Sequence, residues 1–356
     1  MTGYAIYRLP HQRSCTLIEG PVCTLLHCTD LSSQSGFVVT PFLPSDHTPI
    51  TLIKPEKVEA LCKLSAIELA DTASSPSTLY AIQPPTTLKG KDGYAVDFAN
   101  FHAQLLSGTF RKIVLARCVA EPNNGTLTPM QLFQRACQRY PRMFIALVST
   151  PTTGTWLTAT PELLLDSDDN AHWRTIALAG TMKLEAHQLN SEGETLRWST
   201  KNIEEQRLVA TYMAESLEQF TADFNEEGPR TVRAANLVHL RSDFTFTLPP
   251  ATGIGHLLHA LHPTPAVGGL PKHEALQFIA ANEQTPRRYY SGFMGPLLLP
   301  HPTETPATHL YVSLRCMNIT PHTYYLYAGG GLLKDSTMQQ EWQETEAKLE
   351  TMRTLL

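Results

Sequence analysis

The sequence predicts an α+β fold in which large antiparallel sheets form the framework. Three strand-like segments, at 143–149, 154–159 and 163–168, follow one another with only turn residues between them. Such short connections permit antiparallel pairing, whereas parallel neighbours need a crossover of about a dozen residues. Long helical segments occur elsewhere without a regular βαβ rhythm, which favours an α+β fold over a doubly wound sheet.

Hydrophobic spacing places the other elements along the chain. The first 95 residues contain short apolar pieces broken by proline and serine clusters, with one expected helix at 55–70. From residue 96 onward the apolar residues recur more clearly, either in alternation or at helical spacing. Helices are expected at 97–108, 129–140, 199–220 and 338–352, and strands at 112–120, 173–180, 231–240, 243–248, 289–298, 309–319 and 323–328.

Composition and length indicate one globular domain. The 356 residues are 42% hydrophobic and 17% charged, which is typical of a folded soluble protein. No repeat, linker or low-complexity segment divides the chain. We therefore expect a single domain over 1–356, with a variable N-terminal part at 1–95 and a motif-bearing core at 96–356.

Charge and hydropathy exclude several classes of partner. The formal net charge of -5 argues against nucleic-acid binding. No apolar run approaches the ~18–20 residues that span a bilayer, and the first 15 residues lack the apolar centre of a signal peptide. We expect a cytoplasmic protein that does not associate with membranes.

Neither the cysteines nor the histidines form a convincing metal or disulfide motif. The seven cysteines are scattered and include no C-x-x-C pair, so reduced thiols are expected. His256, His259 and His262 recur every three residues, as zinc ligands could on a helix. However, three-residue steps drift around a 3.6-residue helix, and Pro263 should end the helix.

The helix expected at 338–352 places two carboxylates on one face. Glu341 and Glu344 are three residues apart and follow a glycine-rich segment, 325–333, that is expected to be a loop. Positions i and i+3 share a helix face, and carboxylates are the preferred ligands of hard divalent cations. The alternative is a solvated helix in which Glu344 pairs with Lys348.

A second acidic helix could supply the other half of a cation site. Glu204 and Glu205 lie near the start of the helix expected at 199–220. The helix macrodipole favours acidic residues at this end, which is a sufficient structural explanation by itself. Both explanations remain open on spacing alone.

Two residues are candidates for proton transfer. Lys112 opens the apolar run 112–117, where loss of hydration would lower the pKa of its ammonium group and make it a general base. Glu162 precedes three leucines, and a carboxyl in such surroundings has a raised pKa and can act as an acid. The alternatives are a solvated strand end for Lys112 and an exposed turn residue for Glu162.

Other segments are suited to holding an anion. Gly180 and Thr181 end an expected strand in a turn whose backbone N–H groups and hydroxyl could bind a carboxylate. Arg315 interrupts an alternating strand, and its guanidinium matches a planar carboxylate with two parallel bonds. The segment 261–272 combines prolines with a glycine pair, as a rigid ligand-facing loop would.

Taken in order, these segments resemble the chorismate-utilising enzymes. The matching stretches are KIVLAR, TATPELLL, ALAGT, KNIEEQRLV, LHPTPAVGGLP, EQTPR with YYSGFMG, YVSLR, LYAGGGL and EWQETEAKL, from about 110 to 349. The resemblance implies two large antiparallel sheets packed together and surrounded by helices. Among these enzymes the chain is most similar to those that convert chorismate to isochorismate for menaquinone or siderophore biosynthesis.

The resemblance implies a role for each matching residue. Lys112 would activate water for attack at C2, and Glu162 would protonate the departing C4 hydroxyl. Glu205 and Glu344, with Glu341 nearby, would hold Mg2+ against the ring carboxylate. Residues implied in substrate binding are Gly180, Thr181, His262, Leu314, Arg315, Tyr327, Gly329 and Lys348.

Particular residues separate the family's reactions. Ammonia-using members, the anthranilate and aminodeoxychorismate synthases, resemble each other in having glutamine at the Lys112 position, so lysine favours water. Ala179 stands where aminodeoxychorismate synthases typically have lysine. The chain is therefore expected to act as a monomer on chorismate without an obligatory glutaminase subunit. Salicylate synthases keep both Lys112 and Glu162 and are the nearest alternative.

The chain departs from the family's pattern at two positions. Gln206 stands where the family often has histidine, and Ala116 where serine is common. Neither change removes a predicted ligand, although the acidic pair leaves Glu204 as a neighbouring candidate to Glu205. A non-catalytic binder of a phosphorylated ligand is a remote alternative, because the glycine segment lacks the spacing of a phosphate-binding loop.

Overall fold

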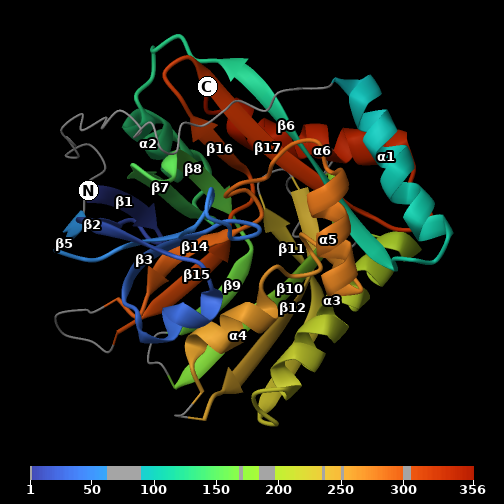
Figure 1. Cartoon of the computed structure of the whole chain (residues 1–356), viewed down its shortest axis with the longest axis horizontal. Helices are drawn as coiled ribbons and strands as arrows, with labels where there is room; N and C mark the ends of the chain where they lie inside the picture. Colours follow the sequence, from blue (N-terminus) through green and yellow to red (C-terminus); the bar gives the residue numbers. More distant parts are fainter. Residues whose placement is uncertain are drawn as a thin grey trace.

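The computed structural model describes residues 2–61, 90–167, 171–183, 197–234, 237–249, 252–299 and 306–356. Within these residues seventeen strands form two antiparallel sheets that share one strand, β2 (Figure 1). The expected α+β fold with large antiparallel sheets is confirmed.

The first sheet has nine strands. Its two edges are strands from opposite parts of the chain, so the N-terminal segment is built into the same sheet as the core motifs. In spatial order the strands are β5 (Lys57–Leu61), β2 (Cys15–Leu25), β1 (Thr2–Arg8), β7 (Phe144–Thr150), β8 (Gly154–Thr160), β16 (Cys316–Ile319), β17 (Thr323–Leu332), β6 (Lys112–Pro122) and β13 (Gly269–Leu270).

The second sheet continues from the other half of β2. Residues 15–19 of β2 pair with β5, whereas residues 22–25 pair with β4. The order then runs through β4 (Ile50–Ile53), β3 (Gly36–Thr40), β14 (Phe293–Leu297), β15 (Thr308–Val312), β9 (Leu163–Ser167), β10 (His172–Lys183), β12 (Leu237–Thr247) and β11 (Phe224–Ala234).

Aromatic side chains fill the space between the sheets. Phe144 of β7 stacks on Tyr311 of β15 with a centroid distance of 4.3 Å, and Trp156 meets Tyr289 edge-on at 5.8 Å. These rings belong to a buried cluster that draws on both sheets. The cluster fixes the separation of the sheets, and with it the position of residues that face each other across the gap.

Helices cover the outer faces of the sheets (Figure 1). On the first sheet, α2 (Pro129–Arg139) packs on β7 and β8, and α6 (Met338–Arg353) on β17. On the second, α3 (Thr200–Glu218) lies along β10 and β12. The remaining helices are α1 (Lys91–Leu106) beside β6, α4 (Ile254–Leu261) against the short helix η1 (Cys28–Ser33), and α5 (Lys272–Asn282) beside β13.

Several expected elements differ from the structure. The helix expected at 55–70 is wrong at its start, because Lys57–Leu61 forms β5 by pairing with β2; residues 62–70 lie outside the described residues. The strand expected at 309–319 is two strands, β15 and β16, separated at Arg315. The strand expected at 231–240 belongs partly to β11 and partly to β12.

The described cysteines are reduced, as expected from the sequence. All six cysteines in the described residues are free thiols, and Cys62 lies outside them. No helix in this part of the chain is both long and apolar enough to cross a membrane.

Candidate functional site

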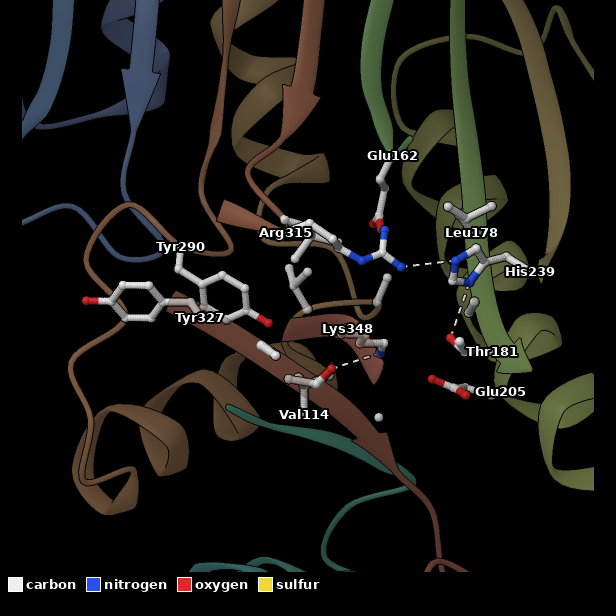
Figure 2. A pocket seen from close by; sticks show the side chains of 18 residues that line it. Val114, Glu162, Leu178, Thr181, Glu205, His239, Tyr290, Arg315, Tyr327 and Lys348 are labelled. Atoms are coloured by element: carbon white, nitrogen blue, oxygen red, sulfur yellow. Dashed lines mark hydrogen bonds between the residues drawn. The ribbon is translucent and has the colours of Figure 1, made fainter. Parts of the chain in front are cut away.

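A cavity lies where β17 and β6 of the first sheet approach β10 and β12 of the second. Helices α3 and α6 contribute Glu205 and Lys348 to its lining (Figure 2). Nine of the residues expected to form the site line this one cavity, although they come from six separate stretches of the chain. They are Glu162, Gly180, Thr181, Glu205, Leu314, Arg315, Tyr327, Gly329 and Lys348.

Arg315 enters the cavity from the break between β15 and β16. Its backbone has a φ of 45°, a conformation that turns the chain sharply and that few non-glycine residues adopt. The buried guanidinium donates from Nη2 to Nε2 of His239 at 3.0 Å. Burial among apolar groups, the charge of Arg315 and that of Lys348 hold the pKa of His239 well below its usual value, so the imidazole is neutral.

The neutral imidazole of His239 orients Thr181. Because Nε2 accepts from Arg315, the single ring proton resides on Nδ1, which lies 3.2 Å from the Thr181 hydroxyl oxygen. Thr181 therefore accepts from His239, and its own hydroxyl proton is available to a ligand in the cavity. Figure 2 shows the sequence of contacts from Arg315 through His239 to Thr181.

Gly180 allows β10 to bulge toward the cavity. The expected turn at 180–181 is wrong: β10 continues to Lys183, with a register shift between Ala179 and Thr181. Gly180 has a φ of 70°, and a Cβ there would come within 2.9 Å of the Asn202 carbonyl oxygen. The side chain of Gln206 holds this backbone by accepting from Ala179 N at 2.8 Å. The glutamine that replaces the family's usual histidine thus anchors the bulge.

Glu162 is a buried carboxyl at the upper side of the cavity in Figure 2. Burial raises its pKa to about 7, although the nearby cations Arg315 and Lys112 lower it in part. At neutral pH both protonation states of Glu162 are therefore populated. Such a carboxyl can hold a proton for transfer, as expected for a general acid.

Lys112 and Glu205 form a buried ion pair beside the cavity. The Lys112 side chain has no exposed surface, and its Nζ lies 3.0 Å from Glu205 Oε1. Burial raises the pKa of Glu205, but the charges of Lys112 and Lys201 lower it further, so the carboxylate is ionised. The solvated alternative for Lys112 is thus excluded.

Glycines in β17 make room for the carboxylates. The glycine-rich segment is a strand rather than the expected loop, because its backbone pairs with β6 over ten residues. A Cβ on Gly331 would stand 2.2 Å from Glu205 Oε1, and one on Gly330 would stand 3.0 Å from Glu341 Oε2. Any larger residue would displace these carboxylate groups.

The two carboxylates on α6 each contact a lysine. Glu344 pairs with Lys348 at 2.7 Å, and Lys348 also donates to the Gly329 carbonyl oxygen at 2.8 Å. Glu341 has no exposed surface and is paired with Lys201 of α3. Burial and the neighbouring charge of Glu344 raise the pKa of Glu341 to about 7, against the opposing effect of Lys201.

The carboxylates provide suitable ligands for a hard cation. Oxygen Oε2 of Glu341 is buried and has no hydrogen-bond partner, and it faces the space left by Gly330. Glu205 lies on the other side, beside Gly331. Within the described ranges, however, no three acidic, histidine or cysteine side chains already gather around a single point. A cation would therefore draw Glu205, Glu341 and Glu344 away from their lysine partners.

The structure separates one predicted residue from the others and adds several. His262 caps the C-terminus of α4, donates to the Pro41 carbonyl oxygen and lines a different cavity. His256 and His259 are exposed and do not join it in a metal site. Sequence reasoning missed His239 and Tyr290 in the catalytic cavity. A histidine within the apolar strand LVHL was the available signal for His239.

The cavity is nearly closed. Its free volume of about 50 Å³ accommodates only one or two water molecules. An organic ligand therefore has to move some of the lining side chains when it binds. The combination of one acid, one buried lysine, an arginine and a nearby carboxylate group defines an enzyme-type site for a small acidic molecule.

Comparison with known proteins places this site in a family. The family model for the chorismate binding enzymes matches residues 32–356. The chain belongs to this family of enzymes.

Curated relatives and a solved structure agree with that assignment. Isochorismate synthase MenF of Escherichia coli strain K12 is 36% identical over 203 residues, covering 56% of this chain and 45% of the relative. The salicylate biosynthesis isochorismate synthase of Pseudomonas aeruginosa is 34% identical, covering 70% and 51%. The solved structure of E. coli MenF, described as menaquinone-specific, superposes with a TM-score of 0.78 at 24% identity, covering 99% of this chain and 88% of that one. The sequence matches span about half the length of these curated relatives.

Proposed function

We propose that the protein is an isochorismate synthase that converts chorismate to isochorismate. The observation that carries this proposal is one cavity that joins Glu162, Arg315 and Lys348 to the buried pair of Lys112 and Glu205. The names of the curated relatives support the same reaction.

Lys112 and Glu162 carry out the two proton transfers of the reaction. Lys112, as the neutral amine, removes a proton from the water that attacks C2, and Glu205 would then serve as a ligand of the cation. Glu162, with a pKa of about 7, gives its proton to the leaving C4 hydroxyl. The double bond shifts between these positions, so no oxidant or reductant is needed.

Charged groups hold the substrate between these residues. Arg315, oriented by His239, is placed to bind one carboxylate, and Thr181 can donate its hydroxyl proton to the same group. Mg2+ held by Glu205, Glu341 and Glu344 would neutralise the ring carboxylate, which otherwise faces like charges at close range.

Incubation with chorismate and Mg2+, followed by chromatographic separation of the products, tests the proposal. Isochorismate should accumulate without added ammonia. Lys112→Ala leaves Glu205 without its cation, so it is assayed on protein shown by circular dichroism to be folded, and it should abolish turnover. Salicylate with pyruvate as the main products would replace the proposal with the salicylate synthase reaction. A requirement for ammonia would exclude both.

A further inference from the structure

A second, larger cavity lies behind the loop that forms one wall of the catalytic cavity. It has a volume of about 820 Å³, within the range of sites for small molecules. Its walls come from the segment before η1, the loop after β3, the C-terminal half of α3, the end of α4 and the start of α5. Apolar and aromatic residues predominate, including Leu26, Phe42, Leu43, Tyr212, Pro263 and Leu276.

Among the charged residues that line the second cavity, Lys272 is the least exposed. The half-buried ammonium of Lys272 donates to the carbonyl oxygens of Ala260 and His262 at 2.8 and 3.1 Å. No carboxylate in the described part of the chain pairs with it, while Asp46 and Glu215 lie at the exposed rim. Burial lowers the pKa of Lys272 to about 8, so a buried counter-ion would favour its charged form. An anionic ligand group would supply it.

The aromatic residues indicate the rest of the ligand. The ring of Tyr212 lies 5.5 Å from Lys272 Nζ, and Phe42 also lines the cavity. Flat apolar ligands gain from stacking on such rings. We propose that this cavity binds an aromatic monocarboxylate, with its carboxylate against Lys272 and its ring between the apolar walls.

The loop between the cavities provides a physical connection to the catalytic site. His262 and Pro263 line the second cavity, whereas Ala266 and Val267, three to four residues later, line the first. The loop continues into β13, whose Leu270 pairs with Lys112. Displacement of its first residues is therefore transmitted to the strand that carries the proposed base.

A second connection passes through Arg287. Its guanidinium lies 4.1 Å from the centre of the Phe42 ring, and it donates to the carbonyl oxygens of Val267 and Val114 at 2.6 and 2.8 Å. Both valines line the catalytic cavity. A ligand that fixes Phe42 and Pro263 thus stiffens two walls of the neighbouring site.

Calorimetric titration with 2-naphthoate tests the binding. We expect one molecule to bind per chain, and the neutral 2-naphthamide to bind at least tenfold more weakly. Lys272→Met should weaken 2-naphthoate at least tenfold, with Lys334→Met as an exposed control that binds normally. Equal binding of the amide, or unchanged binding to Lys272→Met, would overturn the proposal.

A second variant is needed because Lys272→Met also removes a hydrogen bond to the Ala260 carbonyl oxygen at the end of α4. Leu43→Trp fills the second cavity from its half-buried edge, at a residue that does not line the catalytic cavity. It should abolish 2-naphthoate binding while melting as the parent protein does. Retained binding would place the probe elsewhere, for example at Arg315, and would refute the site whether or not the protein makes isochorismate.

Hydrogen exchange tests the connection between the cavities. The amides of Arg111 and Val114 donate to the loop carbonyl oxygens of Leu270 and Gly268 at 2.8 and 2.7 Å. Bound 2-naphthoate should slow exchange at both amides severalfold. Unchanged exchange in the saturated protein would show that the second cavity does not influence the strand of Lys112.

Discussion

At the residue scale, the site depends on Gly331 and Glu162, whose effects follow from the atoms around them. Gly331 contributes only the absence of a side chain, which leaves room for the pair of Lys112 and Glu205. Glu162 is an ordinary carboxyl whose pKa is raised by burial. Both can be altered with little change in the volume of the core.

Gly331→Ala should damage metal binding more than folding. The added Cβ meets the end of a flexible side chain, Glu205 Oε1 at 2.2 Å, so the carboxylate can swing aside at small cost to the fold. Mg2+ affinity measured by calorimetry should fall about 10–100-fold, the usual effect of disturbing the surroundings of a metal ligand. Gly90→Ala, where a Cβ meets nothing within 4 Å, is the matched control. Normal metal affinity in Gly331→Ala would remove Glu205 from the cation site.

Glu162→Gln should stabilise the protein at high pH while abolishing turnover. The folded-state pKa of Glu162 is raised from 4.5 to about 7, so the folded protein retains a proton that the unfolded chain releases between these values. The wild type therefore loses stability as pH rises through this window, up to about 3 kcal/mol above pH 7. Glutamine has no such penalty, and the variant should melt higher than wild type at pH 8 but not at pH 4.5.

The same titration governs activity. The acid form of Glu162 is required for protonation of the leaving group, so kcat/KM of the wild type should decline as pH rises through about 7. A pH profile that is flat from 6 to 8 would contradict the role of Glu162 as the acid.

At the element scale, the segment between α5 and β14 holds the loop before β13 against β6. Arg287 and Glu283 form a buried pair with an Nε to Oε2 distance of 2.5 Å. Glu283 also accepts from the Ala116 backbone N–H at 2.7 Å, and Arg287 donates to the carbonyl oxygens of Val267 and Val114. One ion pair thus joins β6, the loop before β13 and the segment after α5.

Arg287→Leu should destabilise the fold strongly. It leaves the Glu283 carboxylate buried without its cation, and the loss of one partner of a buried pair costs about 3–5 kcal/mol. Urea unfolding should show this decrease in the free energy of unfolding. Arg139→Leu, on the exposed end of α2, should stay within about 0.5 kcal/mol of wild type. The double variant Glu283→Leu/Arg287→Leu should recover part of the loss, because no buried charge remains unpaired.

At the whole-molecule scale, the cation site connects the two sheets through their helices. Glu205 belongs to α3, which packs on the second sheet, and Glu344 belongs to α6, which packs on the first. A cation bound by both would bridge the two layers. Its binding free energy then adds to the stability of the whole fold.

Mg2+ should therefore raise the melting temperature. At a concentration 100-fold above its Kd it should add about 2.7 kcal/mol to the free energy of unfolding. Differential scanning calorimetry with and without EDTA measures this effect. Glu344→Gln should lose most of it, whereas Glu350→Gln, exposed on the same helix, should retain it. An equal Mg2+ response in both variants would exclude Glu344 as a ligand.

The sequence predicted the antiparallel α+β class and nine of the residues that line the candidate cavity, for identifiable reasons. Lys112, Glu162 and Arg315 are charged residues within apolar stretches, and such residues are visible without a structure. The break at Arg315, the strand at the three glycines and the bulge at Gly180 were not predictable from local pattern. Each depends on a partner distant in the chain, as when β6 pairs with β17 and turns an apparent loop into a strand.

His262 and His239 both show that local sequence does not reveal where a residue lies in the fold. His262 lies in a recognisable motif, yet its backbone N–H caps α4 and its imidazole donates to the Pro41 carbonyl oxygen, away from the other predicted site residues. His239 has no motif of its own and acts only because Arg315, 76 positions later, lies beside it. Local sequence identifies chemically capable residues, whereas the sheet pairing decides which of them meet.

Tyr140 connects β1 with α6, which lie far apart in the chain and are therefore synthesised at different times. Its carbonyl oxygen accepts from Arg8 of β1 at 2.6 Å, and its hydroxyl donates to the Thr351 carbonyl oxygen of α6 at 2.8 Å. On the ribosome, β1 can pair early with β2, but its other edge waits for β7, and Tyr140 stays uncovered until α6 has emerged. Exposed strand edges invite pairing with other chains. We therefore expect this part of the fold to form only after α6 has been synthesised, and production of the protein should respond more to chaperone supply than that of a protein whose N-terminal half folds independently.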